Sequence, residues 1–152
     1  MPEGPEPENP KIVVAFDFGL KRIGIASGDT LTRTANPRST LSNGPQGPDW
    51  VGIDRVIADL RPARLAVGEP YNADGSPSAL TEAARRFAEE LSRRSALPVH
   101  LVDERHSSQD AEERLRGMRA SGQRGRRVSR EDVDAVAAAV ILERWFSEST
   151  QR

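Results

Sequence analysis

The segment from Ile12 to Gly19 limits the possible folds of this chain more than any other. Five apolar residues in a row, Ile12 to Phe16, lead directly to Asp17. A short, uniformly apolar run is typical of a central strand that is buried on both faces. Residues 22–28 alternate and predict a second strand that returns beside the first in a hairpin. A carboxylate where such a strand reaches the surface indicates either a turn-forming Asp or a metal ligand.

Charge is unevenly distributed along the chain. The formal net charge is −1, yet seven arginines and no acidic residue lie between Arg114 and Arg130. Such a segment favours a polyanionic partner, and a solvated loop is the alternative. The absence of cysteine excludes disulfides and thiolate metal sites, and two histidines are too few to favour zinc. Without a targeting leader or an apolar run of about 20 residues, we expect a cytoplasmic protein that contacts no membrane.

The order of the predicted elements indicates a mixed α/β domain. A disordered leader is expected at 1–10, the domain at 11–147 and a tail at 148–152. Periodicity, capping residues and turn residues predict five strands, at 12–17, 22–28, 33–41, 64–68 and 98–102, and a loop at 43–48. They also predict four helices: one from Trp50 to Leu60 capped by Asp49, one capped by Ser76, and two at 108–116 and 130–146.

Helices that join successive strands require those strands to be parallel, with right-handed crossovers. The predicted fold class is therefore α/β, with a five-stranded mixed sheet in the order 3-2-1-4-5 and helices on both faces. In open sheets of this kind, ligands bind beyond the carboxyl ends of the parallel strands. We therefore expect the residues that end these strands to share one site.

Carboxylates follow the ends of all these strands. Asp17 ends the first strand, and Glu69 and Glu104 lie just past the fourth and fifth strands. Asp134 lies on the last helix, where apolar residues three, four, seven and eight positions later place it on the inward face. Alternation puts Asp103 and Glu104 on opposite faces, so only one of them joins the site.

A cluster of carboxylates needs compensation. Like charges about 4 Å apart repel by roughly 4 kcal/mol per pair at an effective dielectric near 20. Either their pKa values rise or a divalent cation binds among them, and oxygen ligands favour Mg²⁺ or Mn²⁺. Two such ions about 4 Å apart activate a water and stabilise the leaving oxygen in phosphodiester cleavage. Together with the arginine-rich segment, this chemistry predicts a nuclease.

Motifs in four segments resemble, in order and spacing, those of the YqgF/RuvX family: Ala15–Gly24, Val67–Gly75, Asp103–Arg105 and Val133–Ala135. The resemblance covers roughly residues 12–146 and implies a ribonuclease-H-like fold. It also implies a cytoplasmic bacterial protein, described either as a Holliday junction resolvase or as a nuclease that processes the end of pre-16S ribosomal RNA.

Residue by residue, the resemblance assigns Asp17, Glu104 and Asp134 to the family's acidic site, which we take as catalytic and metal-binding. Lys21 and Arg22 match its basic turn. Further contacts to nucleic acid are expected from four arginines near or within the arginine-rich segment, namely Arg105, Arg124, Arg126 and Arg127.

The chain departs from the family pattern at two positions. Leu20 replaces the usual threonine of the basic turn, which leaves the detailed role of that turn open. Glu69 replaces an apolar residue. The related resolvase RuvC is similar in carrying a glutamate at the end of the corresponding strand, so we hypothesise that Glu69 is a fourth carboxylate, with a solvent-exposed loop glutamate as the alternative.

The sequence is compatible with more than one functional class. The principal hypothesis is an endonuclease that uses Mg²⁺ or Mn²⁺ to cut structured RNA or branched DNA. A non-catalytic RNA-binding ribosome-assembly factor is the alternative. The Asp-Phe-Gly turn also resembles the phosphate loop of actin-like ATPases, but those enzymes need two large domains. A two-fold symmetric junction would call for a homodimer, whereas an RNA-trimming enzyme needs only a monomer.

Overall fold

A computed structural model describes residues 11–104 and 130–150 of the chain. Its elements, in chain order, are β1 (Ile12–Phe18), β2 (Arg22–Asp29), β3 (Ala35–Gly44), β4 (Gly47–Pro48), α1 (Trp50–Leu60), β5 (Arg64–Glu69), α2 (Ala79–Ser95), β6 (Val99–Asp103) and α4 (Arg130–Thr150). The helix predicted at 108–116 lies outside the described residues. Helix α4 continues beyond its predicted end at Phe146, so residues 148–150 of the predicted tail are helical.

The strands form one sheet in the order β4-β3-β2-β1-β5-β6. Strand β1 pairs antiparallel with β2 and parallel with β5, and β5 pairs parallel with β6. The predicted order is therefore confirmed for the five main strands. The sixth, β4, replaces the loop predicted at 43–48: Pro45 and Gln46 make a tight turn, and Gly47 at φ +100° lets the chain pair back on β3.

The predicted N-terminal cap is confirmed for α1 and wrong for α2. Asp49 caps α1 as predicted, with its side chain accepting a hydrogen bond from Gly52 N at 3.0 Å. Helix α2, in contrast, is capped by Ser78 in a reciprocal pair with Thr81, and not by Ser76. The side chain of Ser76 is already bonded to Asp74 in the preceding turn, which explains why the helix starts later.

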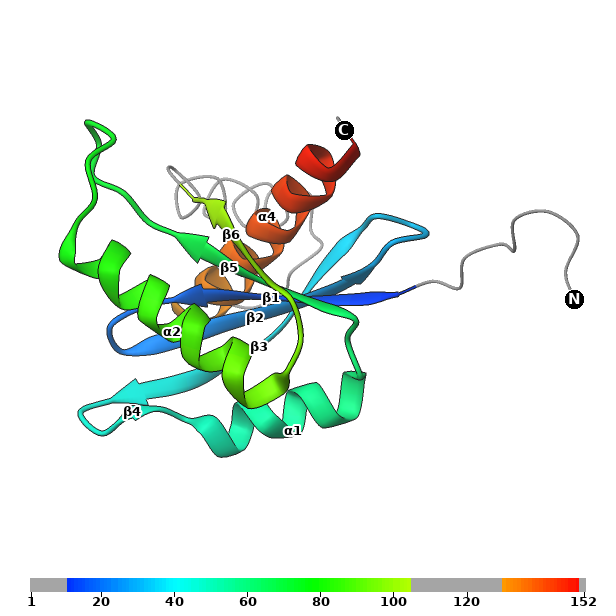
Figure 1. Ribbon diagram of the computed structural model, residues 1–152, viewed down its shortest axis with the longest axis horizontal. Helices are drawn as coiled ribbons and strands as arrows, with labels where there is room; N and C mark the ends of the chain where they lie inside the picture. Colours follow the sequence, from blue (N-terminus) through cyan, green and yellow to red (C-terminus); the bar gives the residue numbers. More distant parts are fainter. Residues whose placement is uncertain (1–10, 105–129, 151–152) are drawn as a thin grey trace, which may run out of the picture.

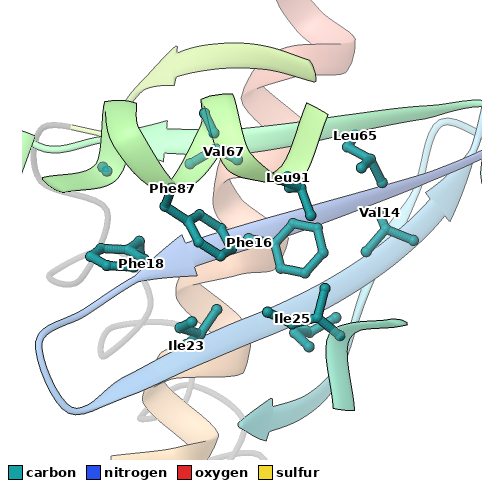
Figure 2. Packing of buried hydrophobic residues seen from close by; sticks show 12 residues of the cluster. Val14, Phe16, Phe18, Ile23, Ile25, Leu65, Val67, Phe87 and Leu91 are labelled. Carbon is teal, nitrogen blue, oxygen red and sulfur yellow. The ribbon is translucent and has the colours of Figure 1, made fainter. Parts of the chain in front are cut away.

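Two hydrophobic layers enclose the sheet, with α1 and α2 on one face and α4 on the other (Figure 1). Alternate residues of β1 divide between them: Val14, Phe16 and Phe18 face α1 and α2, whereas Val13 and Ala15 face α4. Figure 2 shows the first layer, in which the Phe87 ring of α2 packs against Phe16 and Phe18. Trp50 of α1 stacks on the same ring.

The α4 face contains many small residues beside large ones such as Ile141, Leu142 and Phe146. Helix α4 presents a run of buried alanines to the sheet, and β2 contributes Gly24 and Gly28 beneath it. A β-carbon on Gly24 would lie 2.0 Å from the Asp134 carbonyl oxygen, so only glycine allows the first turns of α4 to come this close. Within the described ranges, no helix has the length and apolarity that a membrane span requires.

Candidate active site

Asp17 is held at the end of β1 on the face that α4 covers. It pairs with Gly24 across the β1–β2 hairpin, and strand alternation directs it away from Phe16 and Phe18. The turn that follows is fixed at both ends: Gly19 N donates to Arg22 O at 2.9 Å, and Asn43 Nδ2 donates to Gly19 O at 2.6 Å. The backbone around Asp17 is therefore anchored to β3 as well as to its own hairpin.

Glu104 comes directly after β6 and is 9% exposed. Its backbone N–H donates to Glu69 O at 3.2 Å, which continues the pairing of β6 with β5 by one residue. Its carboxyl group lies over Gly68, because a β-carbon at that position would be 2.3 Å from Glu104 Oε2. The alternation argument thus places Glu104 on the α4 face, in the same layer as Asp17.

Asp134 reaches the same layer from α4. Its backbone lies against Gly24, the residue that pairs with Asp17. Its charge acts on Asp17, and Arg22 Nε donates to Asp134 Oδ2 at 2.7 Å. The structure therefore brings all three predicted acids to one end and one face of the sheet, although they come from distant parts of the sequence.

Burial raises the pKa of both Asp17 and Glu104. Loss of hydration raises the pKa of Asp17 to about 6. A hydrogen bond with Glu104 lowers this pKa, and the negative charge of Asp134 raises it. For Glu104, burial followed by the charge of Asp17 raises the pKa to about 10, while nearby Arg144 acts in the opposite direction. Burial and the repulsion between the two carboxylates therefore both favour the protonated form of the pair.

The carboxylates of the cluster are ligands of the kind that bind a divalent cation, but within the described residues they do not converge on one position. Glu104 Oε2 is buried and has no hydrogen-bond partner among the described residues, and the carboxylates around it are hard oxygen ligands that suit Mg²⁺ or Mn²⁺. In residues 11–104 and 130–150, no three acidic, histidine or cysteine side chains already form a metal-holding group. Arg22 holds the third carboxylate, that of Asp134.

Glu69 does not join the acidic cluster. It shares the α2 face of β5 with Leu65 and Val67, and its carboxylate accepts from Arg85 Nε. Arg85 also donates to Tyr71 Oη at 3.1 Å, so Glu69 ties the loop after β5 to α2. Glu69 therefore forms an ion pair on the opposite face of the sheet from Asp17. It does not lie beside Asp17, Glu104 and Asp134, where a fourth carboxylate was expected.

The predicted nucleic-acid contacts divide into those that the structure describes and those that lie outside it. Lys21 is exposed in the turn beside Asp17. Arg22 is half-buried and bonded to Asp134. The remaining predicted contacts, which lie outside the described residues, are Arg105, Arg124, Arg126 and Arg127.

Sequence reasoning missed Arg144 and the two glycines. Arg144 on α4 donates to Asp103 O and places a positive charge near Glu104. Gly24 and Gly68 make room for Asp134 and Glu104. A glycine inside an apolar strand is itself a signal of close approach, and that signal was available in the sequence.

Comparison with known families gives a match over almost the whole chain. The profile of the RuvX family, described as Holliday junction resolvase, matches residues 11–148. A curated relative from Xanthomonas campestris pv. campestris (strain 8004), named "Putative pre-16S rRNA nuclease", is 43% identical over 151 residues, which cover 99% of this chain and 97% of the relative. A relative of the same name from Legionella pneumophila subsp. pneumophila (strain Philadelphia 1) is 44% identical over 138 residues, covering 91% of this chain and 96% of the relative.

Solved structures show the same fold at low sequence identity. Thermus thermophilus RuvC in complex with a Holliday junction substrate superposes with a TM-score of 0.54 at 18% identity, covering 91% of this chain and 96% of that chain. The yeast mitochondrial Holliday junction resolvase Ydc2 gives a TM-score of 0.53 at 11% identity and covers 91% and 79%. The predicted ribonuclease-H-like α/β fold is therefore confirmed.

Proposed function

This chain belongs to the RuvX family of Holliday junction resolvases, and from that premise we propose that it is a divalent-metal-dependent endonuclease that cuts structured nucleic acid. The observation that carries the proposal is the meeting of Asp17, Glu104 and Asp134 at one end and on one face of the sheet, where a buried oxygen of Glu104 has no hydrogen-bond partner in the part of the chain that the structure describes.

The acidic cluster has the chemistry to hold Mg²⁺ or Mn²⁺. Asp17 and Glu104 are the two ligands already side by side, and Asp134 is the third once it leaves Arg22. Divalent ions at such a site lower the pKa of a water and neutralise charge on a phosphodiester. Because Glu104 lies under α4 and over Gly68, its carboxyl group is pre-positioned by packing and needs little reorganisation.

Basic residues beside the cluster bind the phosphate backbone in this proposal. Lys21 stands exposed at the tip of the hairpin that carries Asp17, and Arg22 is adjacent to it. Arg105, Arg124, Arg126 and Arg127 supply further positive charge in the sequence. Such contacts hold a backbone without reading its sequence, so they serve RNA and DNA alike.

The names of the relatives indicate two substrates to test. We propose the precursor of 16S ribosomal RNA first, because the full-length relatives carry that name, and a four-way DNA junction second, because the family and the shared fold point to it. Both activities belong to a cytoplasmic protein. A junction cut at symmetric positions requires two protomers, so a homodimer on the junction is part of the second proposal.

The decisive experiment compares cleavage of matched precursor RNA and junction DNA in Mn²⁺ by the wild type and by Asp17→Asn. We expect release of a defined RNA end or paired nicks in the junction from the wild type, and a loss of at least 100-fold in Asp17→Asn, as is common when a central ligand is removed. Asp59→Asn is the matched control, because Asp59 is exposed on α1 on the other side of the sheet.

A different result would identify a different function. If the wild type binds structured RNA but cuts neither substrate, and Asp17→Asn behaves in the same way, the chain is the non-catalytic RNA-binding assembly factor.

A further inference from the structure

The ion pair between Arg22 and Asp134 occupies one of the three carboxylates of the proposed site. Arg22 Nε donates to Asp134 Oδ2 at 2.7 Å, and the two side chains are 31% and 23% exposed. The pair is therefore shielded from water on most sides but can still be reached by a solute. It links the first residue of β2 to the start of α4 across the face on which Asp17 lies.

The backbone of Arg22 is held by hydrogen bonds within the turn, whereas its guanidinium group is held by Asp134. Its backbone carbonyl accepts from Gly19 N at 2.9 Å, and the neighbouring Lys21 carbonyl accepts from Asn43 N at 2.9 Å. The turn is thus held at its ends, and the long side chain of Arg22 is the part that can change partner. Among the described residues, the partner that the structure shows for it is Asp134.

In the protein without a metal ion, Arg22 balances the charge of Asp134, because its guanidinium group donates to this carboxylate. A divalent cation held by Asp17, Glu104 and Asp134 would take over this role at Asp134. A guanidinium group and a dication next to the same carboxylate repel each other, so one leaves as the other arrives.

We propose that Arg22 is an internal counter-ion that competes with the divalent cation for Asp134 and moves to a backbone phosphate when nucleic acid binds. This inference rests on the proposed function. Arginine suits both partners, because its planar fork donates equally well to a carboxylate and to a phosphate. Metal binding and substrate binding thereby become cooperative, since each releases what the other needs.

The test is a double-mutant cycle on Mn²⁺ affinity, measured by electron paramagnetic resonance without nucleic acid. We expect Arg22→Gln to bind Mn²⁺ roughly fivefold or more tightly than the wild type, in line with the loss of a shielded competing ion pair. In the Asp134→Asn background, Arg22→Gln should change nothing. Arg55→Gln, which removes an exposed charge on α1, is the control for net charge.

The reciprocal measurement is nucleic-acid binding in EDTA, where no cleavage occurs. Asp134→Asn frees Arg22 and should tighten junction binding more than Asp17→Asn does, although both remove one carboxylate beside the same turn. The difference should vanish in the Arg22→Gln background.

Each outcome decides the inference. If Arg22→Gln binds Mn²⁺ equally or more weakly, Arg22 merely positions Asp134 and the competition is refuted, even where Asp17-dependent cleavage shows that the proposed nuclease stands. If the Mn²⁺ cycle gives the expected pattern but no nucleic acid is cut, the competition stands and the nuclease is refuted. Thermal unfolding of every variant confirms that it is folded.

Discussion

The carboxyl group of Glu104 occupies the space that a side chain on Gly68 would fill, with Glu104 Oε2 at 2.3 Å from the position of the missing β-carbon. Gly68→Ala therefore forces Glu104 or the neighbouring Ile141 to move. We expect a loss of about 1–3 kcal/mol in the free energy of unfolding, typical of overpacking, and weaker Mn²⁺ binding. Chemical denaturation and Mn²⁺ titration measure the two effects.

Gly44→Ala is the matched control for this substitution, because a β-carbon there would have no atom of the described residues within 4 Å. Equal Mn²⁺ affinity in Gly68→Ala and Gly44→Ala would show that the space over Gly68 does not set the position of Glu104.

The stability of the metal-free protein should fall as pH rises from about 4 towards neutrality. Asp17 has a folded pKa of about 6 against an ordinary value of 3.8, so the folded state binds more protons than the unfolded state within that window. Stability is therefore unaffected below the ordinary value and decreases up to the folded pKa, by about 3 kcal/mol. Glu104, with a folded pKa of about 10, extends the decrease to higher pH.

Urea unfolding in EDTA between pH 4 and pH 9 measures this decrease. Asp17→Asn should flatten the lower part of the curve and Glu104→Gln the upper part, and saturating Mn²⁺ should offset the fall in the wild type with release of protons. Parallel curves for the wild type and both variants would show that the pair does not titrate as described.

Glu69→Leu should leave Mn²⁺ affinity unchanged, because the Glu69 carboxylate bonds Arg85 on the α2 face. Loss of this half-shielded pair should cost about 1 kcal/mol of stability, which chemical denaturation detects. A fall in Mn²⁺ affinity comparable to that of Asp17→Asn would instead make Glu69 a ligand.

Lys21→Ala should weaken binding of nucleic acid uniformly, for RNA and DNA alike. The side chain is exposed beside the cluster, so we expect the slope of log affinity against log salt to decrease by about 1 and the stability to stay constant. Lys11→Ala is the control, because Lys11 is an equally exposed lysine at the opposite end of β1. Identical salt slopes for the two variants would remove Lys21 from the interface.

The sequence was sufficient to predict the frame of the site because that frame depends on simple regularities. A run buried on both faces identified β1, and the parity of strand positions separated Asp103 from Glu104. The same parity places Glu69 with Leu65 and Val67, so its position away from the cluster was predictable, although the likeness to RuvC favoured the opposite hypothesis.

Other features depend on contacts between distant residues and could not be predicted from local patterns. The sequence matched Arg22 to a phosphate-binding turn, whereas the structure pairs it with Asp134, 112 positions away. The sequence predicted a loop at 43–48, whereas in the structure the chain turns at Pro45 and Gln46 and Gly47 pairs back on β3.

Asp17, Glu104 and Asp134 lie on the side of the sheet that α4 covers, so the described surfaces of α1 and α2 face away from them. Exposed positions on α2, such as Glu89 and Arg93, offer sites for a fluorophore or a surface tether. A protein immobilised in this way would present the three acids outwards to a long nucleic acid, so a single-molecule measurement could follow one binding event and test the proposed cleavage.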